Sequence, residues 1–170
     1  MNWLDFLDSS STQGHEAEIA LRLLLAALCG GAIGFDREMQ DRPAGLRTHM
    51  LTAMAAAVFT ILTFEIFHAT RALDSKLSLD PIRVIEAVTA GVAFLAAGTI
   101  IQSRGKVEGL TTGAGMWLAG AIGVSCGAGF YRLALIAVAL AMLILVGLRH
   151  VEKVLLKTKG DKADGGGKAG

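Results

Sequence analysis

Five apolar stretches, separated by short charged connections, fill most of the chain between Glu18 and Arg149. A helix needs roughly 20 residues to cross the ~30 Å hydrocarbon core of a bilayer. The stretches of about that length are residues 18–36, 47–68, 82–102, 109–128 and 131–149. A soluble helical bundle would show polar faces at helical period, and the fourth and fifth stretches lack them. The pattern therefore predicts an all-α polytopic membrane protein, a bundle of five transmembrane helices.

Two polar segments flank this predicted transmembrane domain of residues 18–149. Residues 1–17 form a leader without Lys or Arg, and residues 150–170 form a basic, Gly-rich tail whose composition is typical of disorder. The leader opens with acidic residues, whereas a secretory signal has a positively charged region before its apolar core. We therefore expect the first span to remain in the mature protein.

Composition and charge agree with the pattern and add an orientation. Of the 170 residues, 53% are hydrophobic and only 18% are charged, which is too little polar surface to cover a soluble globule. The formal net charge is +1, but Lys and Arg are unevenly distributed, and their positions near span ends set the orientation. With the connection 36–47 inside, four basic residues lie outside, at Arg71, Lys76, Arg83 and Arg132. Eleven lie inside, at Arg37, Arg42, Arg47, Arg104, Lys106, Arg149, Lys153, Lys157, Lys159, Lys162 and Lys168. We therefore expect the N-terminus outside and the C-terminus in the cytoplasm.

The connection between the first two spans, GFDREMQDRPAGLRTHML, holds three acids and three arginines within twelve residues. Pro43 and Gly45 prevent a continuous helix there, so we expect a sharp cytoplasmic turn. Arg47 then lies in the first turn of the second span, where the helix dipole disfavours a cation. Two alternatives supply the compensating negative charge. It comes from Asp36 or Glu38 within this joint, or from a bound anion or a partner's carboxylate.

A second group of charges lies near the outer surface. Arg22, Glu65 and Glu86 fall inside the first three spans at similar depth, and an ionisable residue inside the membrane is by default a candidate functional site. Either glutamate is expected to reach Arg22 across the bundle. Glu18 and Arg83 are the local competitors, and interfacial snorkelling is the alternative reading.

Small residues recur at a four-residue spacing that lets membrane helices approach closely. The pairs are Gly30 with Gly34, Ala87 with Gly91, Gly109 with Gly113, and Gly123 with Gly127. The fifth span is bulky and featureless. We therefore expect spans one to four to form the packed unit, with span five peripheral and facing lipid. Cys29 and Cys126 have no metal-ligand spacing and are interpreted as small core residues.

Four motifs give the chain a family resemblance. They are GFDRE at 34–38, AGLRTHML at 44–51, RVIEAVTAGVAFLAAGTI at 83–100 and VEGLTTGAGMW at 107–117. In this order they resemble the MgtC/SapB family of bacterial inner-membrane proteins. The resemblance implies a multi-pass protein linked to growth at low Mg²⁺ and to survival inside host phagocytes. Such survival is a virulence trait. Well-studied members are regarded as regulators that bind other membrane proteins, including the proton-driven ATP synthase, and not as Mg²⁺ transporters. This chain departs from the usual GIGFLGAG of the third span, with GVAFLAAG at 91–98.

The resemblance also implies a set of site residues near the cytoplasmic layer. They are Asp36, Arg37, Glu38, Arg47, Thr48, His49, Gly109, Thr111, Thr112 and Trp117. The two threonines are expected to cap the fourth span or to bond across helices, and Trp117 is expected to pack deeper in the bundle. His49 is expected to hydrogen-bond within the joint, and a pH-sensing role is the alternative.

Other chemistries find no support in the sequence. The chain lacks the motifs of phosphate-binding loops, zinc enzymes and hydrolase nucleophiles, so we expect no enzyme, no cofactor and no nucleic-acid partner. Asp36 and Glu38 could hold Mg²⁺ through their carboxylates, but three nearby arginines argue against it.

We expect a membrane regulator that lies in the lipid bilayer and binds another integral membrane protein, with a second copy of the chain as an open alternative partner. The competing function is a small proton or cation transporter that uses Glu65 and Glu86 outside and Asp36 and Glu38 inside, and a purely structural role is a third reading.

Overall fold

The computed structural model describes residues 13–73, 80, 82–103 and 106–150, and this part of the chain is almost entirely helical. Its helices are α2 (Gln13–Glu38), α3 (Leu46–Leu73), α4 (Ile82–Gly98), α5 (Leu110–Gly127) and α6 (Tyr131–Met142). A π-helical segment, η1 (Leu143–Gly147), continues α6. The strands β1 (Ile101–Ser103) and β2 (Lys106–Glu108) form an antiparallel hairpin between α4 and α5.

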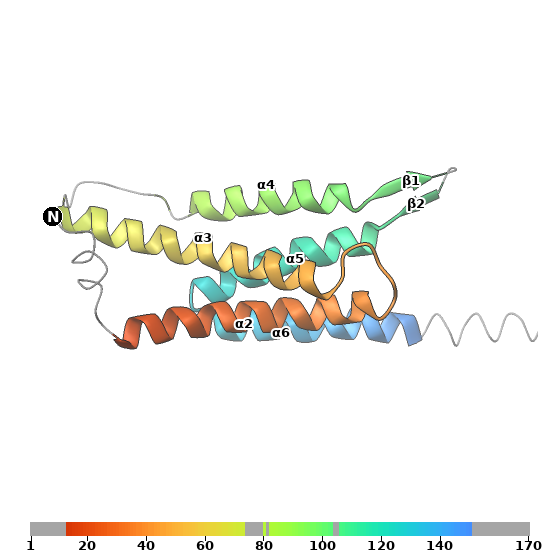
Figure 1. Ribbon diagram of the computed structural model, residues 1–170, viewed down its shortest axis with the longest axis horizontal. Helices are drawn as coiled ribbons and strands as arrows, with labels where there is room; N and C mark the ends of the chain where they lie inside the picture. Colours follow the sequence, from red (N-terminus) through yellow and green to blue (C-terminus); the bar gives the residue numbers. More distant parts are fainter. Residues whose placement is uncertain (1–12, 74–79, 81, 104–105, 151–170) are drawn as a thin grey trace, which may run out of the picture.

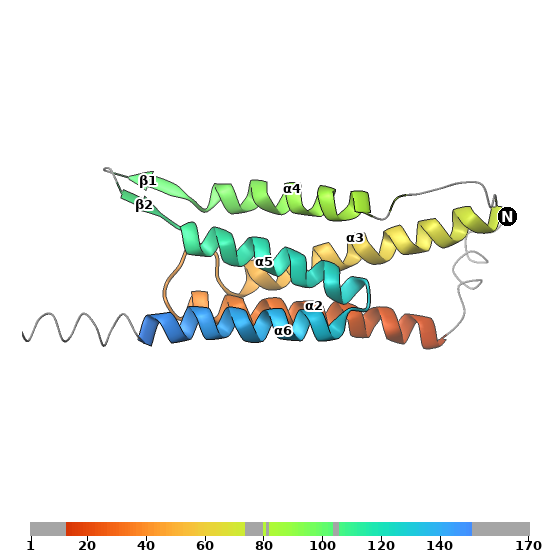
Figure 2. The same cartoon turned by 180° about the vertical axis from the view of Figure 1, so that it is seen from behind.

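Successive helices run in opposite directions, side by side along one long axis (Figure 1). The first residues of α2, α4 and α6 therefore lie at the same end as the last residues of α3 and α5, and the view from behind shows the same order (Figure 2). The hairpin extends beyond the opposite end. This up-and-down arrangement brings the predicted inner residues to one end of the molecule and the predicted outer residues to the other.

The predicted spans correspond to the helices but differ at several ends; α3, for example, continues to Leu73 beyond the predicted end at residue 68. Helix α2 begins at Gln13, so residues 13–17 of the predicted leader are helical, while residues 1–12 and the tail from 151 lie outside the described residues. The third span was predicted to reach residue 102, which is wrong because α4 ends at Gly98 and Ile101 belongs to β1. The β-branched run Thr99-Ile100-Ile101 favours extended backbone over another helical turn.

Three helices of the described chain are long and apolar enough to cross a membrane: His15–Glu38, Leu46–His68 and Tyr131–His150. The other two are shorter, with 17 residues in α4 and 18 in α5. At 1.5 Å per residue they extend about 26 and 27 Å, slightly less than the ~30 Å hydrocarbon core. Of the five predicted transmembrane helices, three therefore have the length and the composition that a span requires.

Helices α2, α3 and α5 approach one another so closely that glycine is required at their contacts. A Cβ on Gly30 would lie 2.5 Å from the His49 carbonyl oxygen, and one on Gly127 would lie 2.7 Å from the Ala57 carbonyl oxygen. A side chain on Gly123 would collide with the Ala53 backbone. The predicted close contacts of the first, second and fourth spans are thus confirmed. Cys29 and Cys126 are buried in this core, as predicted.

Helix α4 differs from the prediction that it joins the packed unit through Ala87 and Gly91. It rests on α5 through a different face, where Val92 contacts Gly120 and Ala96 clusters with Met116. Residues 88, 92 and 96 are four apart, so they share one face, and Gly91 lies on another. A Cβ on Gly91 would meet no atom within 4 Å. The prediction was wrong because β-branched valines make the helix contact in place of the small residues.

Helix α6 is exposed along most of its length, as expected for a helix that faces lipid. Leu140 and Leu143 are 54% and 67% exposed. It is nevertheless not merely peripheral, since Ala134 and Ala141 are buried in the core of α2, α3 and α5, and its end supplies a residue to the site described below.

Candidate functional site

A buried ion-pair cluster lies where α2 ends. The Asp36 side chain is 5% exposed and that of Arg37 is 4% exposed. Arg37 Nη2 donates to Asp36 Oδ2 at 2.6 Å, and Gln40 Nε2 donates to the same oxygen at 2.7 Å. The other carboxylate oxygen, Oδ1, accepts from Arg149 Nη2. A buried carboxylate is stable only when it is paired and hydrogen-bonded, and here both oxygens are used.

Arg149 reaches this cluster from the end of α6, 113 residues along the chain from Asp36. The π-helical turn of η1 precedes it, and a π turn adds a residue and rotates the following side chains relative to a regular helix. Sequence reasoning treated Arg149 only as an orientation signal. Arg149 lies at the inner end of the fifth span, level with Asp36, and this position could have indicated the Asp36–Arg149 pair. Gln40 follows Asp36 by four positions, a spacing at which helical side chains meet, so its hydrogen bond to Asp36 could also have been predicted.

Glu38 caps the start of the next helix. Its Oε2 accepts a hydrogen bond from the Leu46 backbone N–H at 2.9 Å, which satisfies one of the unpaired donors at the N-terminus of α3. Any side chain on Gly45 would collide with the Glu38 carboxylate. We predicted that Asp36 or Glu38 supplies negative charge at the start of the second span. This is confirmed for Glu38, whose carboxylate accepts a hydrogen bond from a backbone N–H there.

His49 is fully buried one turn into α3. Its Nδ1 donates to the Gly45 carbonyl oxygen at 2.9 Å, so the predicted hydrogen bond within the joint is confirmed. The ring's Nε2 faces Gly115 of α5, where a Cβ would lie 3.1 Å away. Neither His49 Nε2 nor Arg37 Nε has a hydrogen-bond partner among the described residues. Residue 115 must therefore be small because the buried imidazole lies against it. The sequence analysis did not identify Gly115.

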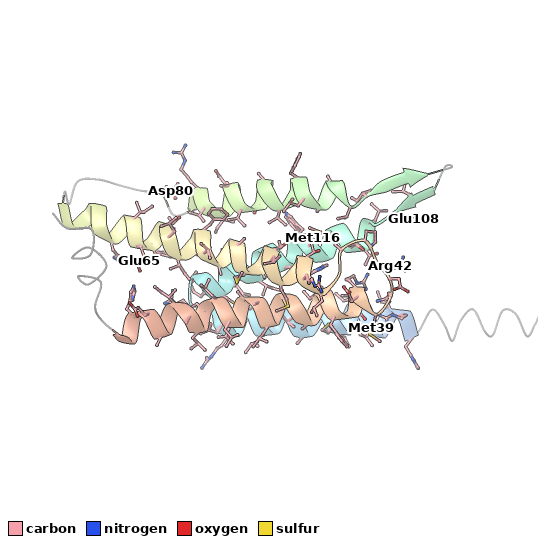
Figure 3. The ribbon with its side chains drawn as sticks, in the orientation of Figure 1. Met39, Arg42, Glu65, Asp80, Glu108 and Met116 are labelled. Atoms are coloured by element: carbon pink, nitrogen blue, oxygen red, sulfur yellow. The ribbon has the colours of Figure 1, made fainter. Side chains whose placement is uncertain are left out.

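Arg47 behaves differently from the prediction that Asp36 or Glu38 holds it. It is exposed, and its guanidinium has no ion pair or hydrogen bond among the described residues. The reason is competition, since Asp36 is occupied by two other arginines and Glu38 by a backbone N–H. Arg42 is also exposed, and Figure 3 shows it at this end of the molecule beside Met39. The joint thus presents cations outward.

The remaining motif residues lie in different environments, and not all of them have the predicted role. Gly109 starts α5 in the left-handed region, at φ 87°, and no side chain caps that helix, so the capping role of the threonines is not observed. Thr112 is buried, whereas Thr111 is exposed. Trp117 is 53% exposed, so its predicted packing inside the bundle is wrong. Thr48 is half-buried, and its carbonyl oxygen accepts a hydrogen bond from the Thr52 hydroxyl at 2.8 Å.

The outer polar layer forms a shallow pocket of about 250 Å³. Arg22 pairs with its local competitor Glu18 and donates to the Gly127 carbonyl oxygen at 2.7 Å, and Glu65 pairs with His15 at 2.8 Å. The predicted pairing of Arg22 with Glu65 or Glu86 is therefore wrong. Glu86 is exposed on α4, outside this pocket. Figure 3 shows Glu65 at the opposite end from Arg42, so the two polar layers are distinct.

Comparisons with known proteins agree with the motifs. The model of the MgtC family matches residues 23–154. The chain is 41% identical over 129 residues to the putative magnesium transporter YhiD of Escherichia coli strain K12, covering 76% of this chain and 60% of YhiD. It is 36% identical over 155 residues to protein SrpB of Synechococcus elongatus, covering 84% and 81% of the two chains. It is 39% identical over 139 residues to protein MgtC of Brucella abortus, covering 82% and 55%. The match spans less than two thirds of YhiD and MgtC, and no solved structure matches the chain.

Proposed function

This chain belongs to the MgtC family, and we propose that it is a regulatory membrane protein that binds another integral membrane protein at the joint between α2 and α3. One observation supports this function above the others. The buried carboxylate and the capping carboxylate of the joint are both engaged within the protein, while Arg47 is exposed and has no partner among the residues that the structure describes.

The proposal includes a topology in which all five helices lie in the bacterial inner membrane. Helices α4 and α5 have 17 and 18 residues, at the short end of the roughly 17–25 residues of membrane spans. The excess of Lys and Arg in the sequence segments predicted to lie on the same side as Arg42 and Arg47 favours placing that side, and the C-terminus, in the cytoplasm. The N-terminus is then outside, and the joint faces the cytoplasmic parts of other membrane proteins.

Arg47 is suited to recognise a partner's carboxylate. It lies in the first turn of α3, where the helix dipole makes a cation unfavourable and an added anion favourable. A guanidinium can donate two parallel hydrogen bonds to a carboxylate, which gives geometric specificity. The buried cluster behind it fixes the ends of α2 and α6, so the joint is a rigid surface on which Arg47 and Arg42 are held.

The family resemblance suggests the class of partner and the physiological setting. It points to the proton-driven ATP synthase as a first candidate, and to adaptation to low Mg²⁺ and survival inside host cells as the conditions. A protein that restrains another membrane protein needs a stable complementary surface but no catalytic group, which suits a joint whose carboxylates are already engaged.

Site-specific crosslinking in native membranes tests this function. A photoreactive amino acid replaces Leu51, an exposed residue one helical turn after Arg47, so that Arg47 itself is kept. The matched control replaces Leu133, which is equally exposed and lies beside Arg132 at the opposite end. We expect a membrane protein, with ATP synthase subunits probed first, to crosslink at position 51 and not at 133. Arg47→Glu should reduce recovery of the same protein with tagged chain at least tenfold, and Arg132→Glu should not. Equal crosslinking at both positions, or none at 51, would contradict the proposal.

A small cation transporter is the second candidate, supported by the name of the relative YhiD and by the outer pocket, which is lined by Glu18 and Glu65. Against it, a transported Mg²⁺ needs carboxylates that are free to bind it, and at the inner end Asp36 is held by two arginines. Flux measurements separate the two functions.

A further inference from the structure

A groove that the proposed function does not use lies between α3 and α4. It has a volume of about 780 Å³, within the roughly 300–1,000 Å³ of small-molecule sites. It exists because α4 meets α5 through Val92 and leaves Gly91 without any atom near its Cβ position. Phe59 and Leu62 of α3 and Leu95 of α4 line it and are more than half exposed.

The groove is apolar along its length. It is lined by two threonines, and each donates its hydroxyl to its own helix: Thr52 to the Thr48 carbonyl and Thr63 to the Phe59 carbonyl, at 2.8 and 2.9 Å. The donor of each hydroxyl is therefore used within α3. The other side chains along the walls are aliphatic or aromatic. An occupant of the groove must accordingly be hydrocarbon over most of its length.

Among the described residues that line the groove, charge appears at one end only. Asp80 and Arg83 are its charged lining residues, and both are exposed at the start of α4. Figure 3 shows Asp80 at the same end of the molecule as Glu65, which is the proposed outer end. Asp80 Oδ1 accepts from the Ile82 N–H at 3.0 Å, which fixes the carboxylate beside the helix start. The Arg83 guanidinium has no ion pair among the described residues.

The groove is shorter than the hydrocarbon core of a bilayer. Its lining extends from Arg83 to Leu95 on α4 and from Thr52 to Ile66 on α3, about 18 and 21 Å at 1.5 Å per residue, compared with ~30 Å for the whole core. After Leu95, the next residue of α4, Ala96, is buried in a cluster with Ala44 and Met116 and does not line the groove. A partner transmembrane helix would need a groove of the full thickness.

We propose that this groove is a phospholipid site of the outer leaflet, with an acyl chain along Gly91 and the phosphate on Arg83. Arginine is the side chain best suited to phosphate oxygens, and the Asp80 carboxylate beside it complements an ammonium group. The pair of opposite charges therefore fits a zwitterionic phosphatidylethanolamine better than an anionic phosphatidylglycerol. The site is independent of the partner-binding joint at the other end of the molecule.

Lipid retention measured by native mass spectrometry tests the site. The delipidated chain is incubated with palmitoyl-oleoyl phosphatidylethanolamine, and we expect one retained lipid per chain. Gly91→Leu places a side chain in the groove, where its Cβ would meet no protein atom within 4 Å, and should reduce retention at least fivefold. Gly98→Leu is the matched control, because a Cβ there also meets nothing within 4 Å and the residue lies outside the groove. Ala87→Leu is a second variant that fills the groove.

The charged end has its own pair of variants. Arg83→Gln should lower retention at least threefold, whereas Arg132→Gln, at an exposed arginine outside the groove, should not change it. The corresponding phosphatidylglycerol should be retained more weakly than phosphatidylethanolamine. Equal retention by the Gly91→Leu and Gly98→Leu variants would overturn the site. A wild-type dimer that Gly91→Leu converts to monomer would also overturn it, since a second copy would then occupy the groove.

Discussion

The two ends of α2 hold ion pairs of the same chemistry in opposite environments. At the inner end, Asp36 and Arg37 are 5% and 4% exposed, whereas at the outer end Glu18 and Glu65 are about half exposed. A desolvated pair cannot lose one member without leaving a buried charge, while an exposed charge exchanges its partner for water. The inner cluster is therefore a fixed structural element that holds the joint, whereas the outer carboxylates Glu18 and Glu65 can exchange their partners for water.

Removing the Asp36 charge should produce the largest effect. Asp36→Asn leaves Arg37 buried without a counter-ion, so we expect the free energy of unfolding in detergent to fall by about 3 kcal/mol, the lower end of the range for a broken buried pair. The matched control is Asp41→Asn, the same change at an exposed residue whose φ of 51° asparagine tolerates. Equal losses in the two variants would remove the distinction between the buried and exposed ends.

Removing Arg149 should have an intermediate effect. Asp36 keeps Arg37 and Gln40, and the Arg149 side chain is 32% exposed, so Arg149→Ala should cost about 1 kcal/mol. Its loss should be non-additive with Asp36→Asn in a double-mutant cycle on unfolding free energies. Arg132→Ala on the same helix serves as control. An additive cycle would mean that α6 is not tied to α2 at this point.

Breaking an outer pair should have the smallest effect. Glu65→Gln removes the charge that His15 contacts, and we expect a loss of about 0–1 kcal/mol because both side chains are about half exposed. Raising the salt to about 1 M shortens the screening length to about 3 Å, so this loss should vanish while that of Asp36→Asn persists. Thermal melts at two salt concentrations measure it. A large, salt-insensitive loss for Glu65→Gln would show that the outer layer is desolvated as well.

The sequence was sufficient for features that depend on one helix or on a local turn. Hydropathy located the helices, small-residue spacing identified the close contacts of Gly30, Gly123 and Gly127, and Pro43 with Gly45 marked the joint. The hydrogen bond of His49 to Gly45 was also predictable, because both residues belong to the same turn. The motifs alone were enough to suggest the family.

The sequence could not predict which arginine pairs with a given carboxylate. Asp36 has arginines at three nearby sequence positions, yet its second partner is Arg149, which a π turn at the end of α6 brings to it. Likewise, Ala87 and Gly91 have the spacing of a helix contact, but Val88 and Val92 of the neighbouring face make that contact. Both outcomes depend on helix rotation, which periodicity in one sequence does not fix.

Magnesium flux tests most directly whether the joint is a binding surface or part of an ion pathway. Purified chain is reconstituted in vesicles that contain a Mg²⁺-sensitive dye, with empty vesicles and the Asp36→Asn variant beside it. Because Asp36 is held by two arginines, the account predicts uptake no faster than in empty vesicles, for wild type and variant alike. Saturable uptake by the wild type that is lost in Asp36→Asn would contradict it.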